Sequence, residues 1–321
     1  MVNFQLESIS EYRTPLMGIA TICILLTHAP VYGVELPSCL HSLLSAAQIG
    51  VMVFFLLSGV GLYYSLQSVE YNKGNIVEWY KKRFTRLFLP YLFIYVPFCA
   101  LTCYIHREGV IIFFFDISTL SFWFGRHTCW FVNMLVPLYI ISPIWYKLIK
   151  IKYSIIPTFI AFCLCLPQNG YWIQASVFFW GFWLAKYIKK GICLKFDHLI
   201  ILFSCVLLLL VAYYVYDIGY LLLYLLTPFV IMSCFFIKKI QKTPFYGILQ
   251  FFGKISLESY LFNITIYSWI NYFNLLPDDL FQYRYIYVVV FGTILAYFIN
   301  VLCTFLVKKH KTIIKDKIQS I

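Results

Sequence analysis

The amino-acid sequence predicts an all-α membrane protein in which about ten helices cross the bilayer and both termini lie in the cytosol. Three observations lead to this expectation: the composition, the length of the apolar runs and the uneven distribution of positive charge. Of the 321 residues, 62% are hydrophobic and only 12% are charged. A typical soluble domain has about 25% charged residues, so the chain is too apolar to cover a water-exposed surface.

Long apolar runs identify the crossing elements as helices. Leu16–Val34, Leu87–Ile105, Leu199–Tyr216 and Ile218–Ile237 contain no Lys, Arg, Asp or Glu. Each is close to the length that a helix needs to cross about 30 Å of hydrocarbon. Strands of a membrane barrel alternate apolar and polar residues, so unbroken runs favour helices.

The expected crossings are distributed over the whole chain, and we expect one transmembrane domain over residues 1–321 with no separate soluble domain. The ten spans begin near Leu16, Leu43, Leu87, Cys129, Tyr153, Tyr171, His198, Ile218, Ile255 and Tyr285. The N-terminal stretch MVNFQLESISEYR has no basic start before an apolar core, so we expect no cleaved signal peptide. The cysteine spacing predicts neither a disulfide framework nor a metal site.

Positive charge sets the orientation of these spans. Of the 25 Lys and Arg residues, 22 fall in the expected inner loops and ends, and only Arg107, Arg126 and Arg284 fall outside. This asymmetry follows the positive-inside rule. An additional crossing at Val110–Phe124 would reverse it, so we expect that segment to lie at the membrane interface. The net charge of +12 therefore indicates anionic lipid headgroups, not nucleic acid, as the partner of the basic clusters.

His28 is a polar residue inside the first expected span. It lies 12 residues after Leu16, about 18 Å along a helix axis, and therefore beyond the bilayer midplane toward the outer side. A histidine that only hydrogen-bonds to a neighbouring helix would explain it. A neutral imidazole at this depth would equally serve as a general base, because its free pKa is near neutrality.

Arg83 and Arg86 lie three residues apart in the basic segment YKKRFTRLFLPY, so they share one face of the helix that enters the membrane. Ordinary positive-inside charge would explain them, as it explains Lys81 and Lys82. However, the chain has 19 Lys and only 6 Arg. A guanidinium grips phosphate with two parallel hydrogen bonds and an ammonium does not, so the pair suits a polyphosphorylated ligand from the cytosol.

Two further groups of polar residues stand out. Glu258 lies inside an expected span, and Lys254, four residues earlier, would pair with it in a structural role. On the outer side, Arg126, His127 and Trp130 are close in sequence. Isolated charges at a surface usually have no function, but an aromatic ring beside two hydrogen-bonding side chains is suited to holding a sugar.

Five short segments follow one another along nearly the whole chain: LLTHA, VFFLLSGVGL, KKRFTRLFLPY, WFVNMLVPLYIISP and GKISLESYL. In this order they resemble the landmarks of the membrane-bound acyltransferase family 3. The resemblance implies transfer of an acyl group, usually acetyl from acetyl-coenzyme A, to a carbohydrate hydroxyl. It also implies that His28 is the catalytic residue and that Arg83 and Arg86 help to hold the donor.

The sequence departs from the family pattern at two positions. The family commonly has an arginine eleven residues before the histidine, and Met17 stands there; Arg13, one helical turn earlier, is the candidate substitute, although Pro15 is expected to start the helix. The late segment often continues to a histidine, and Asn263 stands there, so we expect no acid–base chemistry at that position.

These observations predict an integral membrane O-acyltransferase of a cell-surface or secreted glycan, in the cytoplasmic membrane of a bacterium. Its partners would be acyl-coenzyme A, a carbohydrate or glycolipid acceptor and the lipid bilayer. Acetyl-coenzyme A would be a substrate, with no permanently bound cofactor and no metal. The alternative is a polysaccharide transporter or repeat-unit polymerase, although the two related halves typical of many transporters are not evident.

The charge asymmetry makes the orientation testable. In an otherwise cysteine-free chain on intact cells, a single cysteine at Gln168 should react with a membrane-impermeant thiol reagent, and one at Lys239 should not. Permeabilised cells provide the control, in which both positions should react. The reverse pattern on intact cells would exclude the expected orientation.

Overall fold

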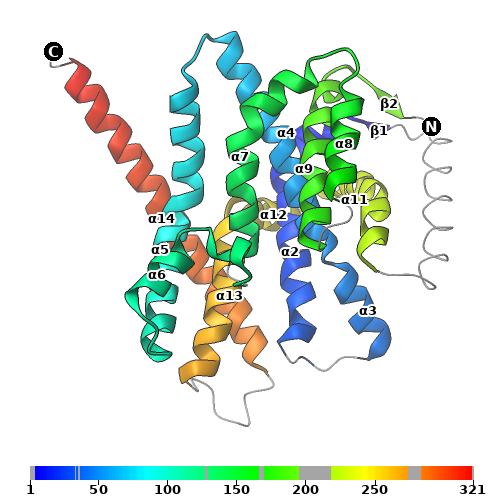
Figure 1. Cartoon of the computed structure of the whole chain (residues 1–321). Coiled ribbons are helices and arrows are strands. Elements are labelled where there is room, and N and C mark those ends of the chain that lie inside the picture. Colours follow the sequence, from blue (N-terminus) through cyan, green and yellow to red (C-terminus); the bar gives the residue numbers. More distant parts are fainter. Residues whose placement is uncertain are drawn as a thin grey trace. The chain divides into compact units, whose positions relative to one another are not determined.

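The computed structural model describes residues 4–32, 34, 37–126, 129–165, 170–194, 218–273 and 283–319, and these residues are almost entirely helical (Figure 1). The helices are α1 (Ser8–Glu11), α2 (Arg13–Val31), α3 (Ser38–Ala46), α4 (Ile49–Tyr71), α5 (Ile76–Ile105), α6 (Val110–Ile117), the 3-10 helix η1 (Ser121–Phe124), α7 (Trp130–Ile149), α8 (Ile155–Cys165), α9 (Gly170–Ile188), α11 (Ile218–Ile240), α12 (Pro244–Lys254), α13 (Ser256–Phe273) and α14 (Arg284–Gln319). Two short strands, β1 (Phe4–Gln5) and β2 (Cys193–Leu194), pair antiparallel. The all-α prediction is thus confirmed.

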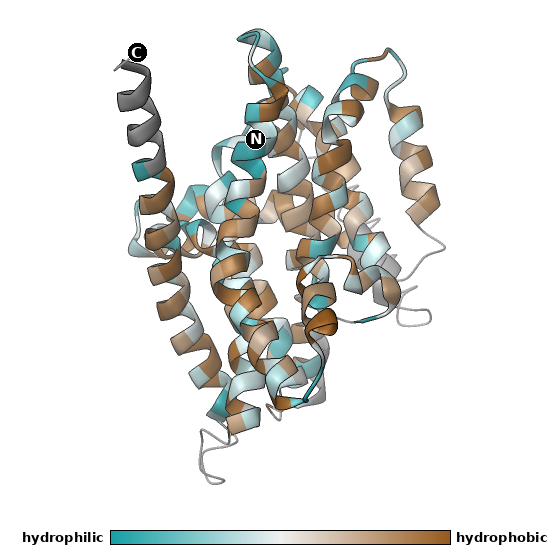
Figure 2. Ribbon diagram, turned by 60° about the vertical axis from the view of Figure 1, so that its left-hand side comes forward, coloured by the Kyte–Doolittle hydropathy of each residue, from teal (hydrophilic) through white to brown (hydrophobic). Residues whose placement is uncertain are grey.

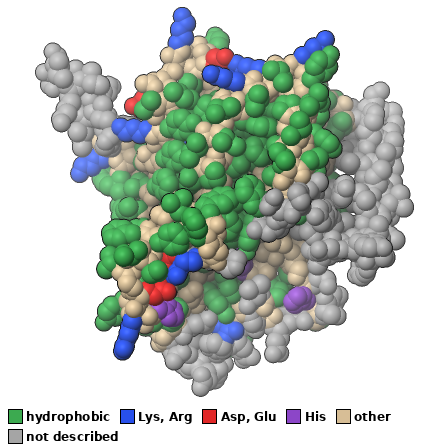
Figure 3. All heavy atoms as spheres, viewed as in Figure 1, with side chains coloured by type: hydrophobic (Ala, Val, Ile, Leu, Met, Phe, Trp, Pro, Cys, Tyr) green, Lys and Arg blue, Asp and Glu red, His purple; other side chains and the backbone are tan. Residues whose placement is uncertain are grey.

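Four helices of the described part are long and apolar enough to cross a bilayer. They are Leu44–Tyr71, Ile76–Ile105, Trp130–Ile149 and Arg284–Lys309. Figure 2 shows α14 as largely hydrophobic as far as the lysines toward its C-terminal end. Hydrophobic side chains also cover much of the face drawn in Figure 3, as expected of a surface that meets lipid. The total of ten crossings and the cytosolic position of both termini stay predictions.

Most expected spans coincide with a helix, and the differences have physical causes. The helix α5 begins at Ile76, well before the expected start near Leu87, because its basic first turns are helical in water as well as in lipid. The helix α2 begins at Arg13, two residues before Pro15. Proline fits the first turn, where backbone N–H groups have no partner within the helix. The span expected from His198 lies outside the described residues.

The chain forms two compact units. Unit 1 contains residues 1–31, 35–79 and 134–254, and unit 2 contains residues 32–34, 80–133 and 255–321. The helices α5 and α7 each pass from one unit into the other. Both units draw on separate parts of the sequence, so neither is a continuous segment.

Unit 1 is held together by helices that approach one another closely. The helix α4 packs on α9 where Gly59 and Gly181 face each other: a Cβ atom at Gly59 would lie 2.2 Å from the Phe178 carbonyl oxygen, and one at Gly181 2.2 Å from the Leu56 carbonyl oxygen. Small residues allow such backbone contact, which replaces the missing hydrophobic driving force between helices in lipid. Gly59 belongs to the VFFLLSGVGL segment, so one role of this segment is to permit the α4–α9 packing.

Unit 2 contains α6, η1, α13, α14 and most of α5. The helices α13 and α14 pack along each other, and the ring of Phe98 on α5 lies 6.5 Å from that of Trp269 on α13. With eight residues, α6 is much too short to cross a bilayer. Its Val110 and Ile111 are 69% and 83% exposed. The interfacial position expected for Val110–Phe124 stays a prediction.

The close approach of α4 and α9 makes Gly59 sensitive to substitution. Gly59→Ala should lower the free energy of unfolding by about 1–3 kcal/mol, because the added methyl group overlaps a backbone carbonyl that cannot rotate away. Gly247→Ala is the matched control, since no atom lies within 4 Å of a Cβ at that position. Thermal unfolding of both variants in detergent measures the difference. Equal melting temperatures for Gly59→Ala and the wild type would contradict the packing.

Candidate functional site

The candidate residues are distributed over both units. His28 and Arg13 belong to unit 1, whereas Arg83, Arg86, Glu258, Arg126 and Trp130 belong to unit 2. His127 lies outside the described residues.

His28 lies in the last turn of α2 and is half-buried. Its Nδ1 atom is 2.7 Å from the carbonyl oxygen of Ile24, one turn earlier in the same helix. A carbonyl oxygen can only accept a hydrogen bond, so this contact requires the proton on Nδ1. In the neutral ring Nε2 then carries the lone pair, and a lone pair at Nε2 is what a general base or a nucleophile needs.

Arg13 contacts the same α4 segment that contains Gly59. Its Nε donates to the carbonyl oxygen of Leu57 at 3.2 Å. Gly61 leaves the space for the guanidinium, because a Cβ atom there would lie 2.4 Å from Nη2 of Arg13. Arg13 thus links the N-terminal end of the His28 helix to the VFFLLSGVGL segment. Its expected role in holding the donor stays a prediction.

Arg83 and Arg86 lie in the cytosolic-side turns expected for α5, and the helix is continuous through both residues. Arg83 is half-buried and Arg86 is exposed. The three-residue spacing therefore places both guanidinium groups on one side of a regular helix, as the sequence predicted. Two guanidinium groups on one side of a helix could bind phosphate groups of one ligand. The role of Arg83 and Arg86 in binding the donor stays a prediction.

Glu258 is 5% exposed and lies in the first turn of α13. The helices α12 and α13 are separated by a break at Ile255, so Lys254 and Glu258 do not share one continuous helix as their spacing suggested. Instead, Nδ2 of Asn300 on α14 donates to Oε1 of Glu258 at 3.0 Å.

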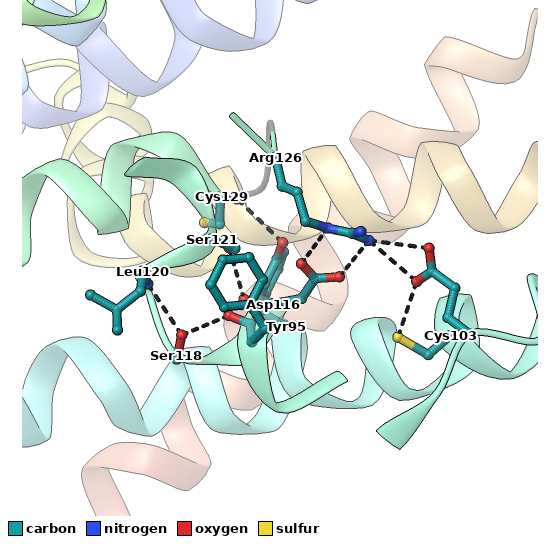
Figure 4. A network of polar contacts seen from close by, with 10 residues as sticks. Tyr95, Cys103, Asp116, Ser118, Leu120, Ser121, Arg126 and Cys129 are labelled. Carbon is teal, nitrogen blue, oxygen red and sulfur yellow. Dashed lines mark hydrogen bonds and ion pairs between the residues drawn. The ribbon is translucent and has the colours of Figure 1, made fainter. Parts of the chain in front are cut away.

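Arg126 is the centre of a polar network on the expected outer side (Figure 4). Its Nε lies 2.7 Å from Oδ1 of Asp116 and its Nη2 lies 2.9 Å from Oδ2, a two-point grip on one carboxylate. The same Nη2 lies 3.2 Å from both oxygens of Glu108. The thiol of Cys103 donates to Glu108 at 3.6 Å. The network ties together the end of α5, α6 and the segment after η1.

The network explains how a buried acid is tolerated in α6. Burial raises the pKa of Asp116 above its ordinary value, and the hydrogen bonds from Arg126 oppose this rise. The sulfur of Cys103 and the carboxylate oxygens of Glu108 and Asp116 lie within 4.8 Å of one another, a composition that could hold a metal ion. Arg126 already supplies the positive charge between the two carboxylates, so the cluster needs no cation.

Arg126 was expected to face an acceptor, and sequence reasoning did not anticipate its two carboxylate partners. Both acids lie within 20 residues of Arg126 in the chain, so pairing charges across a short interfacial segment would have suggested them. Trp130 begins α7, and its ring lies 6.1 Å from that of Phe131. The acceptor role of Arg126, His127 and Trp130 stays a prediction.

Asn263 on α13 and Asn300 on α14 are two further polar residues of unit 2. Nδ2 of Asn263 donates to the hydroxyl oxygen of Tyr285 at 3.4 Å, and Asn263 is 2% exposed. Asn300 was not anticipated either. It is an amide within the apolar run that begins near Tyr285, so the rule that singled out Glu258 would have identified it as well.

These features define a polytopic helical membrane protein with an imidazole near one helix end and an arginine pair on another helix. The family model of the acyltransferase 3 family, described as an acyltransferase domain, matches residues 16–307. The chain therefore belongs to this family and is a membrane acyltransferase. No curated protein and no solved structure matches the chain.

The contribution of the Arg126 network to the stability of the protein can be tested by removing the guanidinium. Arg126→Ala leaves two neighbouring carboxylates without their counter-charge, one of them buried, and should destabilise the protein. The Arg126 side chain is 38% exposed, so solvent screens part of the effect. We expect a loss on the order of 1–2 kcal/mol, below the about 3–5 kcal/mol for a fully buried pair. Arg107→Gln, at an exposed neighbouring arginine, is the control. Thermal unfolding of both variants decides the point, and equal melting temperatures would mean that the network contributes nothing.

Proposed function

We propose that this protein transfers an acetyl group from acetyl-coenzyme A to a hydroxyl group of a carbohydrate on the outer side of the membrane. Membership of the acyltransferase 3 family supports acyl transfer in general. The observation that carries the proposal is the contact between Nδ1 of His28 and the Ile24 carbonyl oxygen, because it places the proton on Nδ1 and the basic lone pair of the neutral ring on Nε2.

His28 would act as the general base. The acceptor hydroxyl gives its proton to Nε2 while its oxygen attacks the thioester carbonyl carbon. The new C–O bond forms and the C–S bond breaks. Coenzyme A leaves as a thiolate, which takes the proton from the imidazolium, and the ring returns to its starting state. The same lone pair would serve a second route, in which Nε2 itself accepts the acetyl group before the acceptor arrives.

The donor would be held by the arginine pair. Coenzyme A carries several phosphate groups, and guanidinium groups match their geometry better than ammonium groups do. Arg83 and Arg86 present two guanidinium groups from one side of α5, at the end where the positive-inside rule places the cytosol. Arg13 is a third candidate. Acetyl-coenzyme A is thus proposed as a substrate, with no permanently bound cofactor.

The acceptor would be a cell-surface or secreted polysaccharide or a glycolipid, and the setting a bacterial cytoplasmic membrane. An aromatic and hydrogen-bonding group at Trp130, His127 and Arg126 supports a carbohydrate. The competing transporter or polymerase has no specific observation in its favour, and neither class would consume acetyl-coenzyme A.

Substitution of His28 tests the proposal. In purified protein reconstituted into liposomes, His28→Gln and His28→Ala should each reduce release of coenzyme A from acetyl-coenzyme A by about 10²–10⁴-fold, the usual cost of losing a general base. Gln keeps a hydrogen-bonding side chain but has no basic nitrogen. Binding of coenzyme A should remain, because the arginine pair is unchanged.

Expression level and thermal unfolding in detergent provide the folding control for both variants. A His28→Gln protein that folds and transfers acetyl at the wild-type rate would exclude His28 as the base. Radiolabelled acetyl-coenzyme A without acceptor separates the two routes. Label bound covalently to wild-type protein and absent from His28→Gln would support an acetyl-histidine, whereas no label would support direct transfer.

A further inference from the structure

A hollow between the end of α5 and the start of α6 is not used by the proposed chemistry. It belongs to unit 2 and lies on the side of the membrane that the charge asymmetry predicts to be the outer one. Its volume is about 210 Å³. Pockets for drug-sized ligands usually have about 300–1,000 Å³, so this α5–α6 hollow suits a single small ring. It is lined by Ala100, Cys103, Tyr104, Glu108, Val110 and Phe113.

Glu108 is the charged residue of the α5–α6 hollow, and both its backbone and its side chain are held. Its backbone N–H donates to the carbonyl oxygen of Cys103 at 2.9 Å, in a turn where Arg107 has a φ of 54°. A left-handed residue of this kind ends a helix, so the end of α5 sets the backbone at Glu108. Both carboxylate oxygens lie 3.2 Å from Nη2 of Arg126, and the Cys103 thiol donates to Oε2 at 3.6 Å (Figure 4). The carboxylate is therefore oriented before any ligand arrives.

The carboxylate of Glu108 keeps a position for one more hydrogen bond. An ionised carboxylate has about four lone-pair sites. In the described part of the chain, Arg126 takes one site on Oε1, and Arg126 and Cys103 take the two sites on Oε2. The side chain is 30% exposed and lines the hollow. Its Oε1 atom can therefore accept a hydrogen bond from a ligand there.

The surroundings of this acceptor indicate the class of ligand. A cation at Glu108 would lie close to the positive charge of Arg126, and an anion would meet the carboxylate itself, so both are disfavoured. A neutral hydroxyl group has neither penalty. The rings of Tyr104 and Phe113 supply the apolar part of the lining. A sugar ring combines hydroxyl donors with an apolar C–H face, and aromatic side chains pack against such a face.

We propose that the α5–α6 hollow is an acceptor subsite for one sugar ring, in which Glu108 accepts a hydrogen bond from a ring hydroxyl and Tyr104 and Phe113 contact the ring face. In this subsite Arg126 is a positioning residue that orients Glu108. The inference rests on the proposed function, since it takes a carbohydrate as the acceptor. It adds residues of α5 and α6 to the outer-side residues that the sequence singled out.

The other occupant that this lining would admit is the acyl chain of a membrane lipid. An acyl chain would contact Val110 and Phe113, but it has no donor for Glu108. Ala100→Leu separates the two occupants from the side of the sugar, because it narrows the hollow and keeps every polar group. If a sugar ring binds there, the larger side chain should weaken its binding. If only lipid fills the hollow, sugar binding should be unchanged.

The experiment uses protein in nanodiscs, which expose both faces, with radiolabelled acetyl-coenzyme A. The acceptor probes are the methyl glycosides of glucose, galactose, mannose, rhamnose and N-acetylglucosamine. Wild-type protein should acetylate at least one of them. Ala100→Leu and Phe113→Ala should raise the KM for that glycoside about three- to tenfold, and Glu108→Gln about tenfold. The KM for acetyl-coenzyme A should stay within about twofold in all three variants, because the donor is held elsewhere.

Phe114→Ala is the matched control, because Phe114 is the next residue of α6, is 61% exposed and does not line the hollow. It should leave both KM values unchanged. Because Glu108→Gln also weakens the bond to Arg126, Ala100→Leu and Phe113→Ala decide the result.

An unchanged glycoside KM in Ala100→Leu and Phe113→Ala, an equal rise in Phe114→Ala, or a parallel rise in the KM for acetyl-coenzyme A would each overturn the inference and leave the proposed function intact. Wild-type protein that consumes acetyl-coenzyme A but acetylates none of the glycosides would overturn the carbohydrate acceptor and this inference with it. Wild-type protein that consumes no acetyl-coenzyme A would overturn the proposed function as a whole.

Discussion

A bilayer offers no water to hydrogen-bond the backbone, and the rest of this structure depends on that constraint. Every N–H and C=O group in the hydrocarbon must find its partner within the chain, so the apolar runs become helices. Helices in lipid gain little from burying apolar side chains against each other, so they associate where their backbones approach closely. In unit 1 this happens where Gly59 of α4 meets Gly181 of α9. A segment of the family pattern is therefore explained in part by packing.

The same constraint determines how polar side chains are held, and similar residues have different surroundings. Arg126 binds Asp116 through Nε and Nη2 and Glu108 through Nη2, so it ties together the segment between α5 and α7 in unit 2. Arg86, in the basic first part of α5, is exposed. Two acids engage the guanidinium of Arg126, whereas an exposed arginine keeps N–H donors within reach of a phosphate.

The hydrogen bond of His28 shows how a helix can prepare a side chain for chemistry. The ring bonds to the carbonyl oxygen of Ile24 in its own helix, so its tautomer is set by local geometry. Family membership defines the general reaction as acyl transfer. In the proposed reaction, this tautomer would let Nε2 take the proton of an acceptor hydroxyl.

The sequence by itself determined the class of fold, the family and the positions of most helices, because hydrophobic runs, charge asymmetry and ordered short segments are local properties of a chain in lipid. It also identified His28, Arg83, Arg86 and Glu258, since polar residues are rare enough in such runs to stand out one by one. Only the tertiary structure decided which residue Glu258 contacts. The four-residue spacing favoured Lys254 as the partner of Glu258, but a break at Ile255 interrupts the helix, and Asn300 arrives from α14. Partners brought together by folding are set by helix packing, which depends on many weak contacts between distant segments and leaves no simple pattern in the sequence.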